Sequence, residues 1–546
     1  MVNLYVNQAG FYPDSEKYAL SAYKFEEFSI KDEQGNICYT GKAAYFGQDE
    51  CSGDEVYSAD FSDFRKEGRY YVETAEGRSY SFEIGDKCLN EALCKMEKAF
   101  YYLRCGCELK PEHAGKFTHA ACHTGKARLW SDHSVELEAT GGWHDAGDYG
   151  RYITAAACAV SHLLYAYKFY PQIFDGQNLN IPESDSAVPD ILEECRYEIE
   201  WMMKLQRADG GVYHKLTTAA HADFVMPEED RGQLYLFDVS SMATADLAAV
   251  CALASGIYRP FDSEFAERLI GAAEKSYGWL KENPEFLGFR NPEGNSTGGY
   301  YEFNDRDNRF WAACEMFAAT GDEKYHDDLK NSLREQFPLT HLGYGSVGGF
   351  GLMAYLFCER KECDEGLYGK FKSEMYRAAD NLVKISEKCG YRTAMYPGEY
   401  CWGSNMNLMK NGMTFAIAQL LADMDGLDRD YIKYAARQMN TLLGANALGY
   451  SYVSGIGEHC INYPHLRPAY ADGIDECIPG MVSGGPNGRP CPSDREVVSF
   501  PEDTPPMKCF EDDYRCFSLN EITIYWNSPA VFTAAALENI KRTGNN

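Results

Sequence analysis

The chain has 546 residues, 45% of them hydrophobic, so it is long enough for two globular domains. Its formal charge of −30 at pH 7 argues against nucleic acid and an anionic membrane as partners, because both need a basic surface. A neutral or cationic substrate fits this charge better.

The N-terminal residues, Met1-Val-Asn-Leu-Tyr-Val-Asn-Gln, are not a basic segment followed by an apolar one, and no run of about 18 apolar residues occurs in the chain. We therefore expect a protein that is either cytoplasmic or secreted with its signal peptide removed. We also expect a monomer. The 20 cysteines lack the compact spacing of a disulfide framework. Most are expected to be reduced, buried thiols, and a minority to bind metal.

Residues 1–87 contain short alternating runs of Tyr, Phe and Val, such as Gly68-Arg-Tyr-Tyr-Val-Glu, separated by turn pairs such as Gln34-Gly. This pattern predicts a small β-sandwich. From Asn90 the apolar period becomes helical, and residues 88–546 are expected to form the second domain. About twelve helices are predicted, at 90–104, 151–169, 188–206, 240–258, 263–283, 307–320, 322–337, 346–359, 366–386, 405–424, 428–443 and 526–541.

Two of these segments, 240–258 and 405–424, are apolar nearly all round, which is typical of an inner layer of helices. About twelve helices joined by long loops suggest two concentric rings. Residues 448–519 break the pattern, with many Gly and Pro residues and almost no helical period. A loop this long inside a compact domain is usually functional or disordered, and its aromatic residues and cysteines favour an ordered loop.

The stretch Thr140-Gly-Gly-Trp-His-Asp-Ala-Gly-Asp-Tyr-Gly-Arg-Tyr152 presents Asp145 and Asp148 three residues apart, before a predicted helix. Two carboxylates this close repel each other, which raises at least one pKa unless they share a water, a metal or a substrate. The pair is suited to holding a nucleophilic water, and Trp143 and Tyr149 offer flat faces on which sugar rings could stack. The alternative is a helix N-terminus with two capping acids.

Near the C-terminus, an acidic loop with a regular set of aromatic residues leads into the last predicted helix. Its spacing of aromatic, Asp, aromatic, Glu, small and Asn resembles a pattern of glycoside hydrolase family 9, at Phe510, Asp512, Phe517, Glu521, Thr523 and Asn527. A second family pattern is met by Ser451-Tyr-Val-Ser-Gly-Ile-Gly and Tyr463-Pro-His-Leu-Arg467, although His459 stands where the family has Asn, Lys or Arg. The segment Val6-Asn-Gln-Ala-Gly-Phe-Tyr-Pro resembles the immunoglobulin-like domain of one branch of the family.

The resemblance implies a mainly α fold, in which an (α/α)6-barrel catalytic domain follows an immunoglobulin-like β-sandwich. It also implies inverting hydrolysis, with Asp148 as general base, Asp145 holding the same water and Glu521 as general acid. Inversion needs one carboxylate that activates water and one protonated carboxyl group that gives its proton to the leaving oxygen. Burial near the aspartates would raise the pKa of Glu521 and so favour its protonated form. Expected substrate contacts are His465, Arg467, Trp402 and Tyr149.

Two cysteines and two histidines near the aspartates could form a tetrahedral zinc set, although they do not follow a zinc-finger spacing. The branch of the family with the immunoglobulin-like domain is similar in having such a zinc. This implies Cys105, Cys122, His123 and His144 as ligands of a structural zinc, with Cys107 in reserve. The alternative is core thiols with surface histidines.

Two further sets of oxygen donors resemble calcium sites of that branch. The first is Glu183, Asp190 and Glu193, where Ser186 replaces an expected Asn. The second set is Asp305, Asp307 and Asn308. Oxygen clusters at helix N-termini suit calcium and helix capping equally, so both interpretations stay open for both sets.

The leading hypothesis is an endoglucanase-type cellulase that hydrolyses β-1,4-glucosidic bonds in cellulose-like glucans. The alternative is an intracellular exo-acting β-glucosidase or exo-β-glucosaminidase on cello- or glucosamine oligosaccharides, which the lack of a signal peptide favours. A carbohydrate-binding protein without turnover would require the loss of an acid or base, and Asp145, Asp148 and Glu521 are all present.

Overall fold

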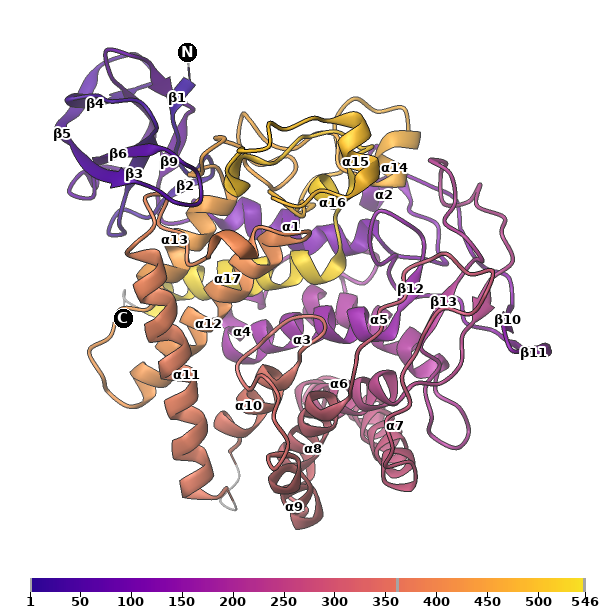
Figure 1. Ribbon diagram of the computed structural model, residues 1–546. Helices are drawn as coiled ribbons and strands as arrows, with labels where there is room; N and C mark the ends of the chain where they lie inside the picture. The colour runs from indigo at the N-terminus through magenta and orange to yellow at the C-terminus, as the bar shows by residue number, and fades with distance from the viewer. Residues whose placement is uncertain (1, 360–362, 544–546) are drawn as a thin grey trace. The chain divides into compact units, whose positions relative to one another are not determined.

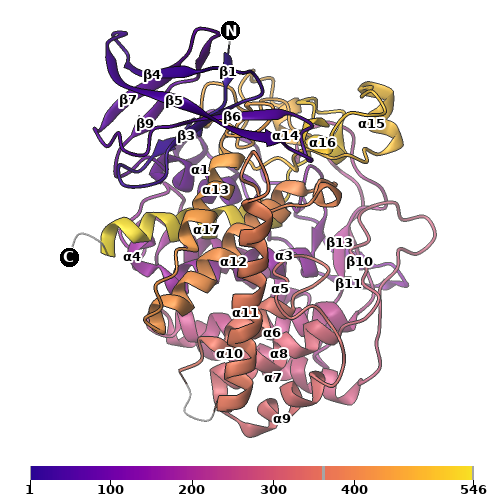
Figure 2. The ribbon, with the colours of Figure 1, turned by 60° about the vertical axis from the view of Figure 1, so that its left-hand side comes forward.

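The computed structural model describes residues 2–359 and 363–543. Figures 1 and 2 show the helices and strands of the chain. Contacts between residues divide the chain into two compact units. The first unit comprises Met1–Ala99 and Ala378–Asn546, and the second comprises Phe100–Arg377.

The N-terminal part of the first unit consists of β-strands, as the alternating pattern predicts. In strand β4, for example, Phe28 and Ile30 point into the core while their neighbours are more exposed, which is the alternation that a strand with one buried face requires. The main path of the sheet runs β1-β8-β7-β4-β5-β6-β3, and β9 pairs with β2 and β7. The strands are β1 (Val2–Leu4), β2 (Gly10–Phe11), β3 (Tyr18–Ser21), β4 (Glu27–Asp32), β5 (Ile37–Gln48), β6 (Glu55–Asp60), β7 (Gly68–Glu73), β8 (Arg78–Ser79) and β9 (Phe82–Ile84).

The segments that join these strands are fixed to one helix of the same unit by polar contacts. Asn7 donates to the Asn440 side-chain oxygen at 2.8 Å, and the guanidinium of Arg437 holds both carboxylate oxygens of Glu16, at 2.8 and 3.0 Å. Both helical partners lie on α13 (Ile432–Leu442). The strands and this helix therefore form one packed body within the unit.

Helices that are buried nearly all round alternate along the chain with helices that bury one face, as expected of paired inner and outer layers. In the second unit α6 contacts α3, α7 and α8, and in the first unit α12 contacts α13 and α17. The mostly buried helices are α3 (Ile153–Phe169), α6 (Ser241–Tyr258), α8 (Arg306–Thr320), α10 (Gly348–Leu356), α12 (Ser404–Met424) and α17 (Ile524–Thr543); the others are α1 (Asn90–Tyr102), α5 (Asp190–Lys204), α7 (Ser263–Glu282), α9 (Glu323–Ser332), α11 (Glu365–Ser386) and α13. Helix α6 is apolar enough to cross a membrane, but 89% of it is buried in the protein, which accounts for its composition.

The second unit also contains a small sheet that the sequence patterns do not predict, with the order β11-β10-β14-β13-β12. Its strand β12 follows the aspartate loop directly, so the helix expected at 151–169 begins only at Ile153. The sheet fixes the end of that loop through antiparallel pairing of β12 with β13. Its strands are β10 (Ala127–Leu129), β11 (Asp132–Leu137), β12 (Arg151–Tyr152), β13 (Lys215–Thr217) and β14 (Tyr235–Leu236).

Candidate active site and metal centre

The aspartate loop of the second unit is held by backbone contacts on both sides. Gly142 has a φ of +79°, and a side chain there would collide with the ring of Trp201 at 2.7 Å, so the turn requires glycine. The Gly142 carbonyl accepts from the amide of Cys105 at 2.7 Å, and the Asp145 amide donates to the Gly150 carbonyl at 3.0 Å. The helix-capping alternative for the aspartates is wrong, because the N-cap of α3 is Tyr152 and no side chain caps it.

Asp145 is a buried carboxylate with an incomplete set of partners. The Tyr300 hydroxyl donates to its Oδ2, whereas Oδ1 has no hydrogen-bond partner among the described residues. Burial and the neighbouring Asp148 raise the pKa of Asp145 well above its ordinary value, and the Tyr300 contact opposes this rise. A buried, unsatisfied carboxylate oxygen is suited to accepting a hydrogen bond from a water or a sugar hydroxyl.

Asp148 contacts three groups through the same oxygen. Its Oδ2 accepts from the Gly150 amide at 3.1 Å and from the Tyr152 hydroxyl at 3.4 Å, and it lies 2.9 Å from Nδ1 of His221. The side chain of Asp148 is 9% exposed, and that of His221 is 39% exposed. The carboxylate is therefore contacted by the stretch that carries it, through Gly150 and Tyr152, and by the separate segment of His221.

A second loop, residues 291–300, contacts Asp145 directly and Tyr152, which is a partner of Asp148. Buried Lys215 on β13 donates to the side chains of Asn291, Asn295 and Thr297 at 2.8–2.9 Å and to the Gly298 carbonyl at 2.7 Å. The Gly298 amide in turn donates to Tyr152, and Tyr300 contacts Asp145. Burial lowers the pKa of Lys215 to about 7, and the charge of Asp148 opposes that shift. The sequence prediction omitted Lys215, because a three-residue strand that begins with lysine shows no period from which burial could be inferred.

The predicted acid, Glu521, lies in the first unit between α16 (Phe517–Asn520) and α17, and is half-buried. Its carbonyl accepts from the Gly484 amide at 2.7 Å. Buried Asn520, which precedes it, donates to Asp512 at 2.7 Å and to the Tyr463 carbonyl at 2.9 Å. These contacts therefore fix the backbone at Glu521.

The predicted sugar contacts of the first unit lie close to Glu521. The His465 amide donates to the Asn520 carbonyl at 3.0 Å, and the Phe517 ring lies 5.9 Å from the His465 ring and 5.1 Å from the Trp402 ring. Trp402 is 48% exposed, so part of its apolar ring is open to solvent, whereas Arg467 is buried. The first unit thus presents an acid, an imidazole and an indole together.

Tyr149 does not fit its predicted role as a sugar platform. The residue is 6% exposed, and its ring packs against His144 at 4.8 Å and His123 at 5.4 Å. Its hydroxyl donates to the Val225 carbonyl at 2.6 Å. A ring enclosed in this way has no open face for a sugar, so we assign it to packing around the histidines.

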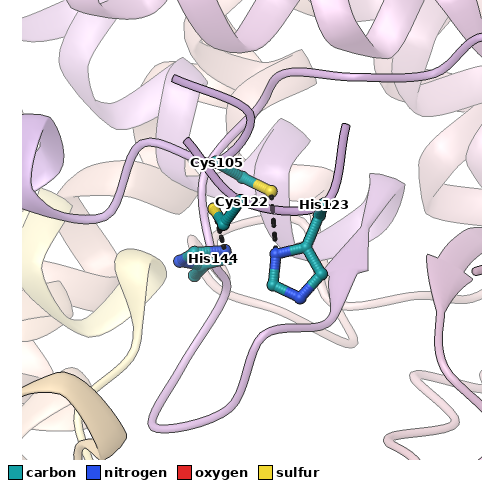
Figure 3. A group of neighbouring side chains, drawn as sticks. All are labelled: Cys105, Cys122, His123 and His144. Carbon is teal, nitrogen blue, oxygen red and sulfur yellow. Dashed lines mark hydrogen bonds between the residues drawn. The ribbon is translucent and has the colours of Figure 1, made fainter. Parts of the chain in front are cut away.

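The four predicted zinc ligands lie together in the second unit (Figure 3). Their ligand atoms are all within 4.8 Å of one another, and all four residues are buried. The Cys105 sulfur lies 3.6 Å from Nδ1 of His123, and the Cys122 sulfur lies 3.9 Å from Nε2 of His144. The alternative of core thiols with surface histidines is wrong, and the reserve ligand, Cys107, is not in the group.

The surroundings of this group suit a metal. Burial lowers the pKa of His144 to about 4, which keeps the imidazole neutral as a metal ligand must be. His123 directs its other nitrogen, Nε2, to the carboxylate of Asp230 at 3.2 Å, a partner that would fix the ring orientation of a ligand. Two thiols and two imidazoles form a possible metal-binding cluster.

The first predicted calcium set is occupied by protein partners. Arg104 donates to both oxygens of Glu183, at 3.0 and 2.9 Å. Asp190 accepts from the Leu179 amide at 2.6 Å, and Glu193 accepts from a serine hydroxyl at 2.7 Å. These contacts favour the structural interpretation for this set.

The second predicted calcium set is joined by two carboxylates that the sequence prediction omitted, Asp246 and Glu302. The amide of Asn308 donates to Asp246 at 2.9 Å, whereas Asp305 pairs with Arg309 and Asp307 accepts from the amide of Val347, each at 2.8 Å. Burial, with further contributions from neighbouring carboxylates, raises the pKa of Glu302 to about 8 and that of Asp246 well above its ordinary value. Calcium at this cluster stays a prediction.

Comparison with known proteins identifies the family. Residues 90–534 match glycosyl hydrolase family 9, and residues 2–79 match the cellulase N-terminal immunoglobulin-like domain. A cellodextrinase of Butyrivibrio fibrisolvens is 41% identical over 98% of this chain and 100% of its own. A mutant thermostable endoglucanase from Alicyclobacillus acidocaldarius has a TM-score of 0.91 at 32% identity, over 98% of this chain and 100% of that one. A Zn-binding triple mutant of the family 9 endoglucanase J30 has a TM-score of 0.90 at 31% identity, over 96% of this chain and 99% of that one.

These matches confirm the expected fold class, a mainly α protein of the (α/α)6-barrel type preceded by an immunoglobulin-like β-sandwich. The family match spans the aspartate loop and Glu521 alike. The chain belongs to glycosyl hydrolase family 9 and is a glycoside hydrolase.

Proposed function

We propose that this enzyme hydrolyses β-1,4-glucosidic bonds in cellulose-like glucans and inverts the anomeric centre. The observation that carries the proposal is the pair of buried carboxylates, Asp145 and Asp148, on a loop fixed by glycine turns in a family 9 chain. Relatives named as a cellodextrinase and as endoglucanases support the same bond type.

In this proposal Asp148 is the general base and Asp145 shares its water. Asp148 is oriented from one side by Gly150, Tyr152 and His221, which fixes the direction of the carboxylate. Oδ1 of Asp145, which has no partner in the described part of the chain, supplies a second acceptor for the same water. Deprotonation of that water as it attacks C1 gives inversion, because attack occurs opposite to the departing oxygen.

Glu521 is the proposed acid, which protonates the departing glycosidic oxygen. Inverting enzymes separate the two catalytic carboxyl groups by about 6.5–9.5 Å so that water fits between base and sugar. The exposed face of Trp402 would stack on a glucose ring, and His465 and Arg467 would hydrogen-bond its hydroxyls.

Zinc is the metal that we propose for Cys105, Cys122, His123 and His144. Two thiols and two imidazoles match the ligand preference of this ion, and four protein ligands leave no position for water. When bound, zinc would supply a fixed cross-link between three chain segments and no catalytic chemistry. Because His144 precedes Asp145, the cross-link would also hold the aspartate loop.

Products from a ladder of cello-oligosaccharides test the function. An endoglucanase cleaves internal bonds, so several product sizes are expected early in the reaction, and matched glucosamine oligosaccharides are expected to be poor substrates. Release of single sugar units from one chain end would support the exo-acting alternative instead. Absence of cleavage of any β-1,4-glucan would contradict the proposal.

A further inference from the structure

We propose that His221 is a positioning residue for the general base, holding the carboxylate of Asp148 in its working orientation. This inference rests on the proposed function, because it assigns a role relative to Asp148. The contact that carries it joins Nδ1 of His221 to Oδ2 of Asp148 at 2.9 Å, which is within hydrogen-bonding distance. His221 belongs to none of the motifs found in the sequence.

The loop that carries His221, residues 218–233, is fixed at three points by separate parts of the second unit. At its start, Asn295 donates to the Ala219 carbonyl at 3.0 Å. In its middle, the Tyr149 hydroxyl donates to the Val225 carbonyl at 2.6 Å, and near its end Asp230 contacts His123 at 3.2 Å. The backbone that carries His221 is therefore fixed, so it can keep the half-exposed imidazole in contact with the Asp148 carboxylate.

The three contacts of Asp148 described above differ in length. The Tyr152 hydroxyl is 3.4 Å away, at the long end of hydrogen bonding, and the Gly150 amide is at 3.1 Å. His221 makes the shortest of these three contacts and the one that carries a positive charge when the ring is protonated. Removal of the His221 imidazole should therefore affect the orientation of the Asp148 carboxylate more than it affects substrate binding.

Three substitutions separate this role from a general effect on the loop. An asparagine amide can occupy the place of Nδ1, a glutamine amide lies nearer the place of Nε2, and alanine has no donor. On an aryl cellobioside we expect His221→Ala and His221→Gln to lower kcat by about 10-fold or more, with KM close to that of the wild type. His221→Asn should recover most of the loss, and His133→Ala, at an exposed histidine on β11, should behave as the wild type.

A double-mutant cycle shows whether the effect passes through the base. If His221 acts only by positioning Asp148, His221→Ala should have little further effect in the Asp148→Asn background, whereas independent effects would multiply. The loss should also be equal for good and poor leaving groups, because the base acts on water. Full activity of His221→Ala, equal losses in the Asn and Ala variants, or multiplying effects would each overturn the inference.

The wild-type rate tests the proposed function separately, because every His221 effect is measured relative to it. If the wild type cleaved no glucan, a crystal structure of His221→Ala would still decide the inference. A rotated Asp148 carboxylate would support the positioning role, and an unmoved carboxylate would overturn it.

Discussion

Glu521→Gln should lower kcat on cello-oligosaccharides by about 10²–10⁴-fold, the usual contribution of general acid catalysis. The same variant should retain much of its activity on an aryl cellobioside with an acidic phenol, because that leaving group needs little protonation. Asp148→Asn should instead damage both reactions alike, since neither can proceed until water is deprotonated. Steady-state kinetics with both substrates measure the contrast.

The exposed Glu511 offers a matched control in the same acidic loop as Glu521. Glu511→Gln removes a charge of the same kind and should leave both activities near the wild-type level. Equal losses on both substrates for Glu521→Gln and Asp148→Asn would mean that the acid and base roles are misassigned.

Cys122→Ser should reduce zinc content, stability and activity together. Loss of one of four ligands weakens the cross-link that holds His144, and through it the backbone of Asp145. We expect activity to fall by about 10- to 100-fold, as when the support of a metal-bound histidine is removed. The melting temperature should fall by roughly 1 °C for each kcal/mol of stability lost, because the unfolding entropy grows with chain length. Elemental analysis, thermal unfolding and kinetics measure the three effects.

Cys107→Ser is the matched control, because this thiol lies two residues from Cys105 but outside the ligand group. The control should keep about one zinc per chain, following the four-ligand rule. Fully active wild-type enzyme without zinc would contradict the proposed cross-link.

The helices could be predicted from sequence because their burial is periodic or complete. The segments expected at 240–258 and 405–424 are observed as Ser241–Tyr258 and Ser404–Met424, since helices buried nearly all round keep almost every position apolar. Strand β12 was missed because two residues, Arg151 and Tyr152, are too few to show an alternating period.

The candidate site could be predicted only where its residues are neighbours in sequence or match a family pattern. Asp145, Asp148 and the four clustered ligands were found in this way. Tyr300 and His221 were not, because they approach the aspartates from loops that are distant in sequence, and Tyr300 is 155 residues from Asp145. Tyr149 was misread because a sequence does not show which aromatic face remains open.

The anomeric configuration of the first product tests the central claim most directly. Proton NMR of a cello-oligosaccharide digest, recorded before mutarotation, distinguishes the two anomers at the new reducing end. Direct attack by a water held between Asp145 and Asp148 predicts the α-anomer from a β-linked substrate. Initial formation of the β-anomer would contradict the account, because it requires a covalent glycosyl-enzyme and a carboxylate nucleophile in place of the proposed base.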